Sequence, residues 1–258
     1  MTARHPAGEA DDVFDASYAR FWAAELGGER LADDIARIKA VAAKVGPGAA
    51  AGSASAWRVL DLGCAFGRIA NQLAAEGMAV TAVDQSAELL ALARAAAADP
   101  SPTFVQADMR ALTMPDSFDL ALLWFSTFGY FDDEQNRGVL DRVFASLRIG
   151  GTLIIETRNW DRISREFEPW SVRFSGDDVL IERHEFIPLT GRQQTSQLAL
   201  VDGRWRNRSY FLRRYTGAEL ASMLFGVGFA DVHLYGEDLR PLTVEHRRLI
   251  AVAVRSGA

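Results

Sequence analysis

Three places in the sequence combine glycine or an acid with the end of an apolar run. The first is Val59-Leu60-Asp61-Leu62-Gly63-Cys64-Ala65-Phe66-Gly67, where glycines would let a ligand approach the backbone. The second is Asp84, seventeen positions after Gly67, close to the spacing of roughly 20 at which a carboxylate meets ribose hydroxyls. The third is Asp108, which is suited to an adenine amino group, with Met109 as an apolar wall.

The apolar spacing predicts elements that would bring these three places together. Strands and helices alternate over 58–62, 67–76, 79–84, 87–97, 103–106, 118–125, 133–147 and 151–157. Continuous apolar strands separated by amphipathic helices indicate a mostly parallel sheet that is covered on both faces. Ligands bind such a sheet beyond the carboxyl ends of its strands. The three places should therefore converge on one nucleoside-shaped slot.

The flanking segments read differently. Residues 14–45 have the spacing of two helices broken near Gly27-Gly28, and 46–55 read as a flexible connector. After Asn159 the segments 171–174, 179–186, 193–201 and 207–215 are separated by turn residues, which predicts an inserted antiparallel sheet. A helix over 216–225, capped by Thr216, and strands over 230–235 and 249–254 would close the main sheet.

The predicted fold is α/β: a Rossmann-like, doubly wound, seven-stranded, mostly parallel sheet with N-terminal helices and an inserted antiparallel sheet. Four parts are expected along the chain. They are an N-terminal helical lid over 1–56, a cofactor-binding core over 57–159, a substrate or oligomerisation subdomain over 160–215, and a closing helix and strands over 216–258.

This pattern resembles the class I S-adenosylmethionine (SAM) dependent methyltransferases over roughly residues 57–159. Asp61, Gly63 and Gly67 match the family's Asp-x-Gly-x-Gly-x-Gly loop, Asp84 matches its ribose acid and Asp108 its adenine contact. Residues 124–130 resemble the strand end beside the methionine moiety, and 148–151 resemble the turn before strand five. Ala65 and Ile149 depart from the glycine and proline that are common there.

The resemblance implies SAM as the cofactor, and we expect its contacts at one set of residues. They are Tyr18, Trp22, Asp61, Gly63, Cys64, Ala65, Gly67, Asp84, Gln85, Asp108, Met109 and Phe125. Asp61 could equally orient the loop through backbone amides. For Cys64 we favour a small packing role over that of a nucleophile. For Phe125 we favour a place in the core. Tyr18 and Trp22, one helical turn apart, favour a lid that excludes water.

Two side chains are the candidate catalytic residues. His184 would face the substrate from the inserted sheet with an ordinary pKa suited to neutral pH, although a structural histidine is the more common case. Tyr130 follows, and Glu156 is a third candidate base. Arg204, Arg206 and Arg208 share one strand face and Arg213-Arg214 follow. They could cradle an anionic substrate, but we favour a solvated face.

Composition limits the other classes of function. With a net charge of −6 the 258-residue chain lacks the basic surface that nucleic-acid binding requires. One cysteine excludes an intramolecular disulfide, and no His, Cys, Asp or Glu spacing suggests a metal site. Residues 1–12 do not read as a signal peptide, and no apolar run is long enough for a membrane. We expect a cytoplasmic protein that does not bind membranes. The sequence leaves open whether it forms a homodimer.

The expected reaction is methyl transfer from SAM to a nitrogen or oxygen of a small-molecule metabolite, with specialised-metabolite biosynthesis as the setting by analogy. Another reaction of SAM on the same fold is one alternative, and a non-catalytic SAM binder is a second. A nicotinamide-linked oxidoreductase is disfavoured. Cys64, Ala65 and Phe66 separate Gly63 from Gly67, whereas the dinucleotide pattern is Gly-x-Gly-x-x-Gly.

Overall fold

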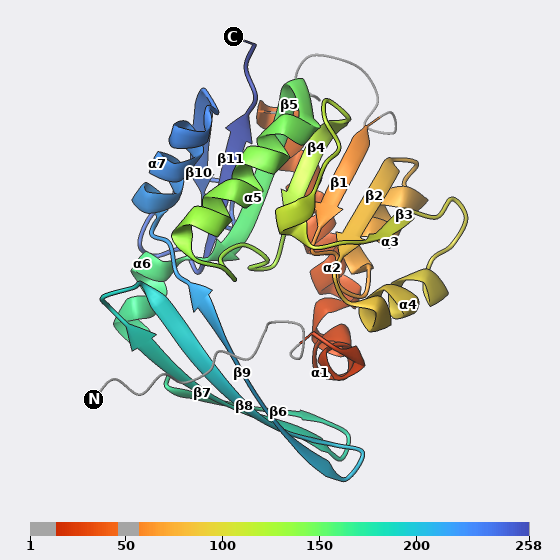
Figure 1. Ribbon diagram of the computed structural model, residues 1–258, viewed down its shortest axis with the longest axis vertical. Coiled ribbons are helices and arrows are strands. Elements are labelled where there is room, and N and C mark those ends of the chain that lie inside the picture. The colour runs from red at the N-terminus through yellow and green to blue at the C-terminus, as the bar shows by residue number, and fades with distance from the viewer. Residues whose placement is uncertain (1–13, 46–56, 258) are drawn as a thin grey trace.

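The carboxyl ends of the central strands lie along one edge of the main sheet, as the strand order requires. The computed structural model describes residues 14–45 and 57–257. Its seven-stranded sheet has the order β10-β11-β5-β4-β1-β2-β3 (Figure 1). The strands are β1 (Arg58–Leu62), β2 (Ala79–Asp84), β3 (Thr103–Gln106), β4 (Phe118–Leu123), β5 (Leu147–Arg158), β10 (Asp231–Tyr235) and β11 (Arg248–Val254). Strand β11 is antiparallel to β5 and β10, and the other pairings are parallel.

Helices cover both faces of this sheet because the central strands are buried on both sides. One apolar cluster joins the sheet to α2 (Gly28–Val45), α3 (Arg68–Ala75) and α4 (Ala87–Ala95). A second cluster joins the other face to α5 (Asp133–Ser146) and α7 (Gly217–Val227). Every residue of β4 is buried, and all of them except Asp119 are apolar, as expected for a strand covered on both faces.

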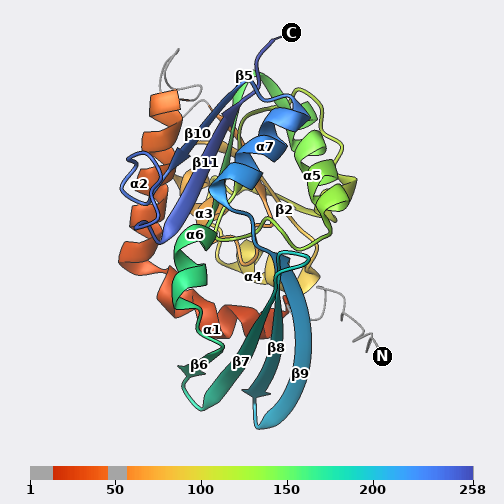
Figure 2. The same ribbon diagram turned by 90° about the vertical axis from the view of Figure 1, so that its left-hand side faces the viewer.

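The inserted segment forms a separate four-stranded antiparallel sheet beyond that edge (Figure 1). Its strands are β6 (Trp170–Ser175), β7 (Asp178–Ile187), β8 (Arg192–Val201) and β9 (Arg204–Arg213). Helix α1 (Ala16–Leu26) lies between the lower edge of the core and this sheet (Figure 2) and contacts both α4 and β6. Leu180, Ala199 and Val201 pack on Phe21 of α1, so one face of the sheet points towards the core.

The fold predicted from the sequence is confirmed in all of these respects, and the differences are local. The helix break falls at Gly27, and Thr216 caps α7 through a capping box with Glu219. Three short pieces were not predicted: α6 (Trp160–Ile163) and the 3-10 turns Met109–Ala111 and Ser164–Glu166. Strand β5 begins at Leu147, four residues before the predicted start, because Leu147 already pairs with Phe118 of β4. Further along, the amide of Gly150 donates to the carbonyl of Arg255, and the amide of Arg255 donates to that of Gly151.

Three expectations lie outside the described residues or remain untested. The connector over 46–55 and the segment 1–12 lie outside the described residues. The division of the chain into four functional parts stays a prediction. Among the described residues, no helix has both the length and the apolar character needed to span a bilayer.

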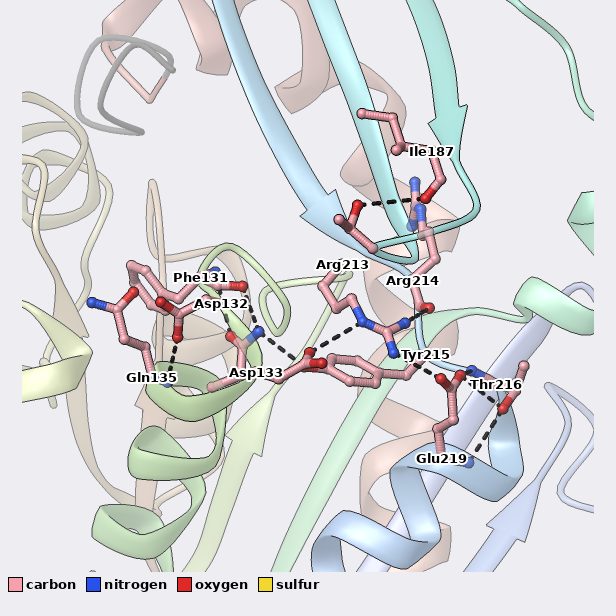
Figure 3. A network of polar contacts seen from close by, with 12 residues as sticks. Phe131, Asp132, Asp133, Gln135, Ile187, Arg213, Arg214, Tyr215, Thr216 and Glu219 are labelled. Carbon is pink, nitrogen blue, oxygen red and sulfur yellow. Dashed lines mark hydrogen bonds and ion pairs between the residues drawn. The ribbon is translucent and has the colours of Figure 1, made fainter. Parts of the chain in front are cut away.

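Arg213 ties the inserted sheet to the core at the end of β9 (Figure 3). Its Nε donates to Asp133 of α5 at 3.1 Å, and its Nη2 donates to Glu219 of α7 at 2.7 Å. The guanidinium also lies 4.4 Å from the centre of the Tyr215 ring. One side chain thus fixes the exit of β9 against two helices.

Arg213→Ala should therefore loosen the sheet from the core. The guanidinium is largely buried while both carboxylates are exposed, so we expect a loss of about 1–3 kcal/mol in the free energy of unfolding, measured in urea. Arg213→Lys keeps the positive charge but cannot bind both carboxylates through separate guanidinium nitrogens. It should therefore recover only part of the lost free energy of unfolding. A full recovery in Arg213→Lys would contradict the account.

Candidate functional site

The loop after β1 is held against the end of β2. The amides of Gly63 and Cys64 both donate to the carbonyl of Val83, at 2.7 and 3.0 Å. The amide of Ala65 donates to Asp84 Oδ2 at 2.8 Å. Ala65 has φ +49°, a left-handed conformation that costs an alanine roughly 1–2 kcal/mol. Such strain is typical of backbone held in place for a ligand.

Glycine is required at two positions of this loop. Gly63 has φ +74°, and an added Cβ would lie 2.2 Å from Thr127 Cγ2. Gly67 has φ +75°, and its added Cβ would lie 2.7 Å from Ala93 Cβ of α4. The first glycine lets the β1 loop approach the loop after β4, and the second lets α3 begin close to α4.

Asp84 ends β2 with its carboxylate facing the same loop. Oδ1 accepts from the amide of Ser86 at 2.9 Å, and Oδ2 accepts from that of Ala65. Burial raises the pKa of Asp84 above its ordinary value, although the backbone hydrogen bonds oppose the shift. Each oxygen retains a free lone pair, so the carboxylate can still accept from two hydroxyl groups.

A cleft opens in front of these groups and encloses about 670 Å³ of empty space, open solvent included. It is lined by residues from α1, β1, β2 and the loops after β3 and β4. Eight of the residues predicted from the sequence are among them: Tyr18, Gly63, Ala65, Asp84, Gln85, Met109, Phe125 and Tyr130. The junctions after β1, β2 and β3 thus meet at one place, as the sequence predicted.

An adjoining hollow of about 410 Å³, open solvent included, holds Asp61 and Cys64. Asp61 is only 4% exposed, and its Oδ2 has no hydrogen-bond partner within residues 14–45 and 57–257. Burial raises the pKa of Asp61 to about 7; Arg68 lowers the value and Asp84 raises it. Burial likewise raises the pKa of the Cys64 thiol, so this cysteine is no ready nucleophile.

Three of the predicted cofactor contacts, Gly67, Asp108 and Trp22, line neither the cleft nor the adjoining hollow. Gly67 faces Ala93 of α4. Asp108 is absent from the lining of the cleft and binds the guanidinium of Arg110, with Nε at 2.9 Å from Oδ2. Arg110 in turn lies 4.4 Å from the centre of the Phe131 ring. Trp22 packs edge-on against Phe125, with ring centres 5.8 Å apart. Asp108 and Trp22 therefore lie behind the residues that line the cleft.

Sequence reasoning did not single out several residues that line the cleft. Phe14 packs edge-on against Tyr18 and Tyr130, with ring centres 5.3 and 5.2 Å apart. Thr127 and Phe131 come from the loop after β4. The signal was present for Phe14, because it lies one helical turn before Tyr18. Thr127 lies within residues 124–130, which the resemblance placed beside the methionine moiety, although it was not named as a contact. Phe131 follows that segment in a loop with no periodicity that would predict its direction.

His184 belongs to a polar network on the core-facing side of the inserted sheet. In the strand register it lies opposite Thr195, which lies opposite Tyr210. Its Nδ1 lies 3.0 Å from Thr195 Oγ1 and 3.1 Å from Gln193 Nε2. Burial lowers the pKa of His184, and Glu182 opposes this shift. The imidazole is therefore neutral near pH 7, and the described cleft does not include it.

The other candidates are tied to fixed partners. Glu156 accepts from the amide of Phe125 at 2.8 Å and pairs with Arg248, which makes it a positioning group. Arg206 and Arg208 both pair with Asp15. Our preference for a solvated face is wrong for Arg208, whose side chain is 9% exposed, because the start of α1 covers it.

Comparison with known proteins agrees with this geometry. A family model described as a methyltransferase domain matches residues 59–151. The chain is 28% identical over 204 residues to the cypemycin N-terminal methyltransferase of Streptomyces, covering 76% of this chain and 82% of that protein. It is 33% identical over 157 residues to a ubiquinone biosynthesis O-methyltransferase of Xanthomonas campestris, covering 57% and 60%. Two further curated relatives are matched over about half of their own length, 49% and 51%.

The same fold occurs in solved structures. The CcbJ methyltransferase from Streptomyces caelestis superposes with a TM-score of 0.72 and 22% identity, over 96% of this chain and 97% of that one. The likeness thus includes the N-terminal helices and the inserted sheet as well as the matched domain. At this identity it establishes the fold.

Proposed function

We propose that this chain, whose residues 59–151 form a methyltransferase domain of the class I SAM-dependent family, transfers the SAM methyl group to a nitrogen or oxygen of a small molecule. The observation that carries the proposal is the meeting of Gly63, Asp61 and Asp84 around one cleft and its adjoining hollow. An acid at the end of β2 and a glycine in the β1 loop suit a nucleoside.

The described residues fit SAM. Asp84 retains acceptor capacity for the two ribose hydroxyls, and Met109 and Phe131 offer apolar walls for the adenine. The unpartnered Oδ2 of Asp61 suits the ammonium of the methionine moiety, since a buried carboxylate oxygen without a partner is costly. Bound SAM supplies an electrophilic methyl group on a positively charged sulfur.

The chain contributes positioning and exclusion of water. The aromatic side chains of Phe14, Tyr18 and Phe125 line the cleft. They exclude water from the site and help to align the methyl donor with the acceptor. Burial raises the pKa of Tyr130 to about 12. Tyr130 therefore stays protonated at neutral pH and donates a hydrogen bond to the acceptor instead of removing a proton.

A general base remains optional in this proposal. The neutral His184 is the candidate, because its lowered pKa leaves the imidazole free of charge. Its hydrogen bonds to Thr195, Gln193 and Ser171 would have to rearrange for direct contact with an acceptor. An amine acceptor that binds in its neutral form needs no such step, and this favours nitrogen over oxygen.

Incubation with SAM labelled in the methyl group tests the proposal. Label should appear in a small-molecule product when amines and hydroxy acids are screened, and S-adenosylhomocysteine (SAH) should accumulate in equal amount. Consumption of SAM without formation of SAH would instead support another SAM reaction, because SAH forms only when the methyl group leaves the sulfur. Binding of SAH with no turnover of any acceptor would support a non-catalytic binder.

Asp61 should make cofactor affinity depend on pH. Its folded-state pKa is raised from 3.8 to about 7. Its contribution to stability is therefore fully present below about pH 4 and lost as pH rises through 7. The cofactor ammonium needs the ionised carboxylate, so SAH affinity should rise about tenfold from pH 6 to pH 8. Calorimetry checks this, and Asp61→Asn should flatten the profile; an unchanged slope in that variant would rule out Asp61.

A further inference from the structure

Three arginines gather between the inserted sheet and the carboxyl edge of the core. Arg158 ends β5 and Arg248 begins β11, and the two residues are directly paired in the strand register. Arg214 follows β9. The charges of Arg158 and Arg248 both act on Arg214, so the three guanidiniums share one region. None of them lines the cofactor cleft.

The partners of these arginines leave several N–H groups unused. Arg214 is 8% exposed, and its Nε donates to Gln193 Oε1 at 2.9 Å. Its buried Nη1 has no partner in the part of the chain that the structure describes. Arg248 pairs with Glu156 through Nε, and its buried Nη2 has none. Arg158 is exposed and forms no side-chain hydrogen bond or ion pair with any residue of 14–45 or 57–257.

Three acids lie near these arginines, but only one of them forms an ion pair with an arginine of this group. Glu156 is taken by Arg248. Glu182 is bound by the Ser171 hydroxyl at 3.0 Å and the Gln197 amide at 2.8 Å, and no ion pair joins it to an arginine of the described chain. Glu168 also acts on Arg158 through its charge, but this carboxylate is exposed and forms no ion pair in the described chain. Arg158 and Arg214 therefore have no ion-pair partner among the described residues. An unpaired buried charge is unfavourable unless a counter-ion arrives.

Burial lowers the pKa of Arg214 to about 10, with the charge of Arg158 adding to the effect. The guanidinium still carries its charge at neutral pH. Tyr130 connects this region to the cofactor cleft, because it lines that cleft and its hydroxyl lies within electrostatic range of Arg214. A group bound by the arginines would therefore lie on the acceptor side of the cleft.

We propose that Arg214 and Arg158, with Nη2 of Arg248, bind an anionic oxygen group of the acceptor, a carboxylate or a phosphate. This inference rests on the proposed function and narrows its substrate class to acidic small molecules. A planar guanidinium matches either oxyanion through two parallel hydrogen bonds. Holding the anion there orients the rest of the acceptor, including its nucleophilic atom, towards Tyr130 and the cofactor.

Thermal unfolding of the SAH-loaded protein tests the inference with three probes of matched shape: benzoate, phenyl phosphate and neutral benzamide. We expect benzoate or phenyl phosphate to raise Tm in a saturable way and benzamide to leave it unchanged. Which of the two anions binds more tightly identifies the oxyanion. Arg214→Gln and Arg158→Gln should each weaken anion binding at least tenfold, and Arg214→Lys should recover part of it. Arg240→Gln, at an exposed residue paired with Asp238, is the matched control.

The outcomes separate this inference from the proposed function, because the Tm rise caused by SAH alone is read first. If SAH raises Tm and the anions do not, the anion site is wrong and the cofactor assignment stands. Should Arg214→Gln fail to fold, Arg158→Gln decides, since that side chain has no partner to lose. Equal anion binding in Arg158→Gln and Arg240→Gln would mean an adventitious ion only and would overturn the inference.

Discussion

Asp84→Ala should weaken SAH binding about 100-fold or more. The variant removes a half-buried carboxylate that faces the cleft and retains acceptor capacity on both oxygens. Hydrogen bonds to a charged group contribute about 1.5–3 kcal/mol each, and two of them to ribose hydroxyls correspond to a factor of at least 100. Isothermal titration calorimetry with SAH measures this directly.

Two control variants separate the ribose contact from the support of the loop. Asp84→Asn keeps one oxygen for the amide of Ala65 or Ser86, so it should hold the loop better than alanine while still losing the charge. Asp108→Asn should lower affinity far less, because Asp108 is paired with Arg110 and lies outside the cleft lining. Unchanged affinity in Asp84→Ala, or a larger loss in Asp108→Asn, would show that the ribose contact is misplaced.

Gly63→Ala should destabilise the protein by about 2–4 kcal/mol. The backbone at Gly63 has φ +74°, which costs an alanine roughly 1–2 kcal/mol. The new Cβ would also lie 2.2 Å from Thr127 Cγ2, and overpacking of this kind costs about 1–3 kcal/mol. Thr127 cannot turn aside easily, because its hydroxyl donates to the Trp124 carbonyl at 2.6 Å.

The double variant Gly63→Ala with Thr127→Ser resolves the two costs. Serine keeps the hydroxyl and removes the methyl group that clashes, so about half of the loss should return while the backbone strain remains. Urea unfolding measures the stabilities, and SAH calorimetry should show at least a tenfold loss of affinity in the single variant. A single variant with wild-type stability would mean that the loops after β1 and β4 do not approach as closely as described.

The central sheet could be predicted from the sequence because its strands are mostly apolar, with single acids at Asp61 and Asp119. Both faces are buried in the strand segments 59–62 and 118–123. Strands of this kind predict a parallel sheet with helices on either side. Thr216 predicted the start of α7 because a capping box is a local interaction. Both features depend on residues that are close together in the sequence.

The residues on the cofactor side of the site could likewise be predicted from local sequence, except where a short turn brings two side chains together. Gly63 and Asp84 were found because a strand that runs into a glycine or an acid fixes where the next group points. The pairing of Asp108 with Arg110 was missed, although the two are only two residues apart, because a 3-10 turn brings them together. No sequence period marks a turn of three residues.

The acceptor side depends on contacts between distant segments, which a single sequence does not contain. Arg213 and Arg214 are adjacent in the chain, yet one joins β9 to two helices and the other is buried beside Gln193. Alternation along a strand predicts which side chains share a face, but it does not predict what covers that face. Asp15 of the N-terminal segment covers Arg208, and nothing near either residue indicates that pairing.

The most direct test of the account is a crystal structure of the protein with SAH. The account predicts the ribose hydroxyls within hydrogen-bonding distance of Asp84, the α-ammonium beside Asp61 Oδ2, and the adenine between Met109 and Phe131. A nucleoside bound elsewhere on the fold, or a cleft closed by the Phe14 and Tyr18 side chains with SAH excluded, would contradict it.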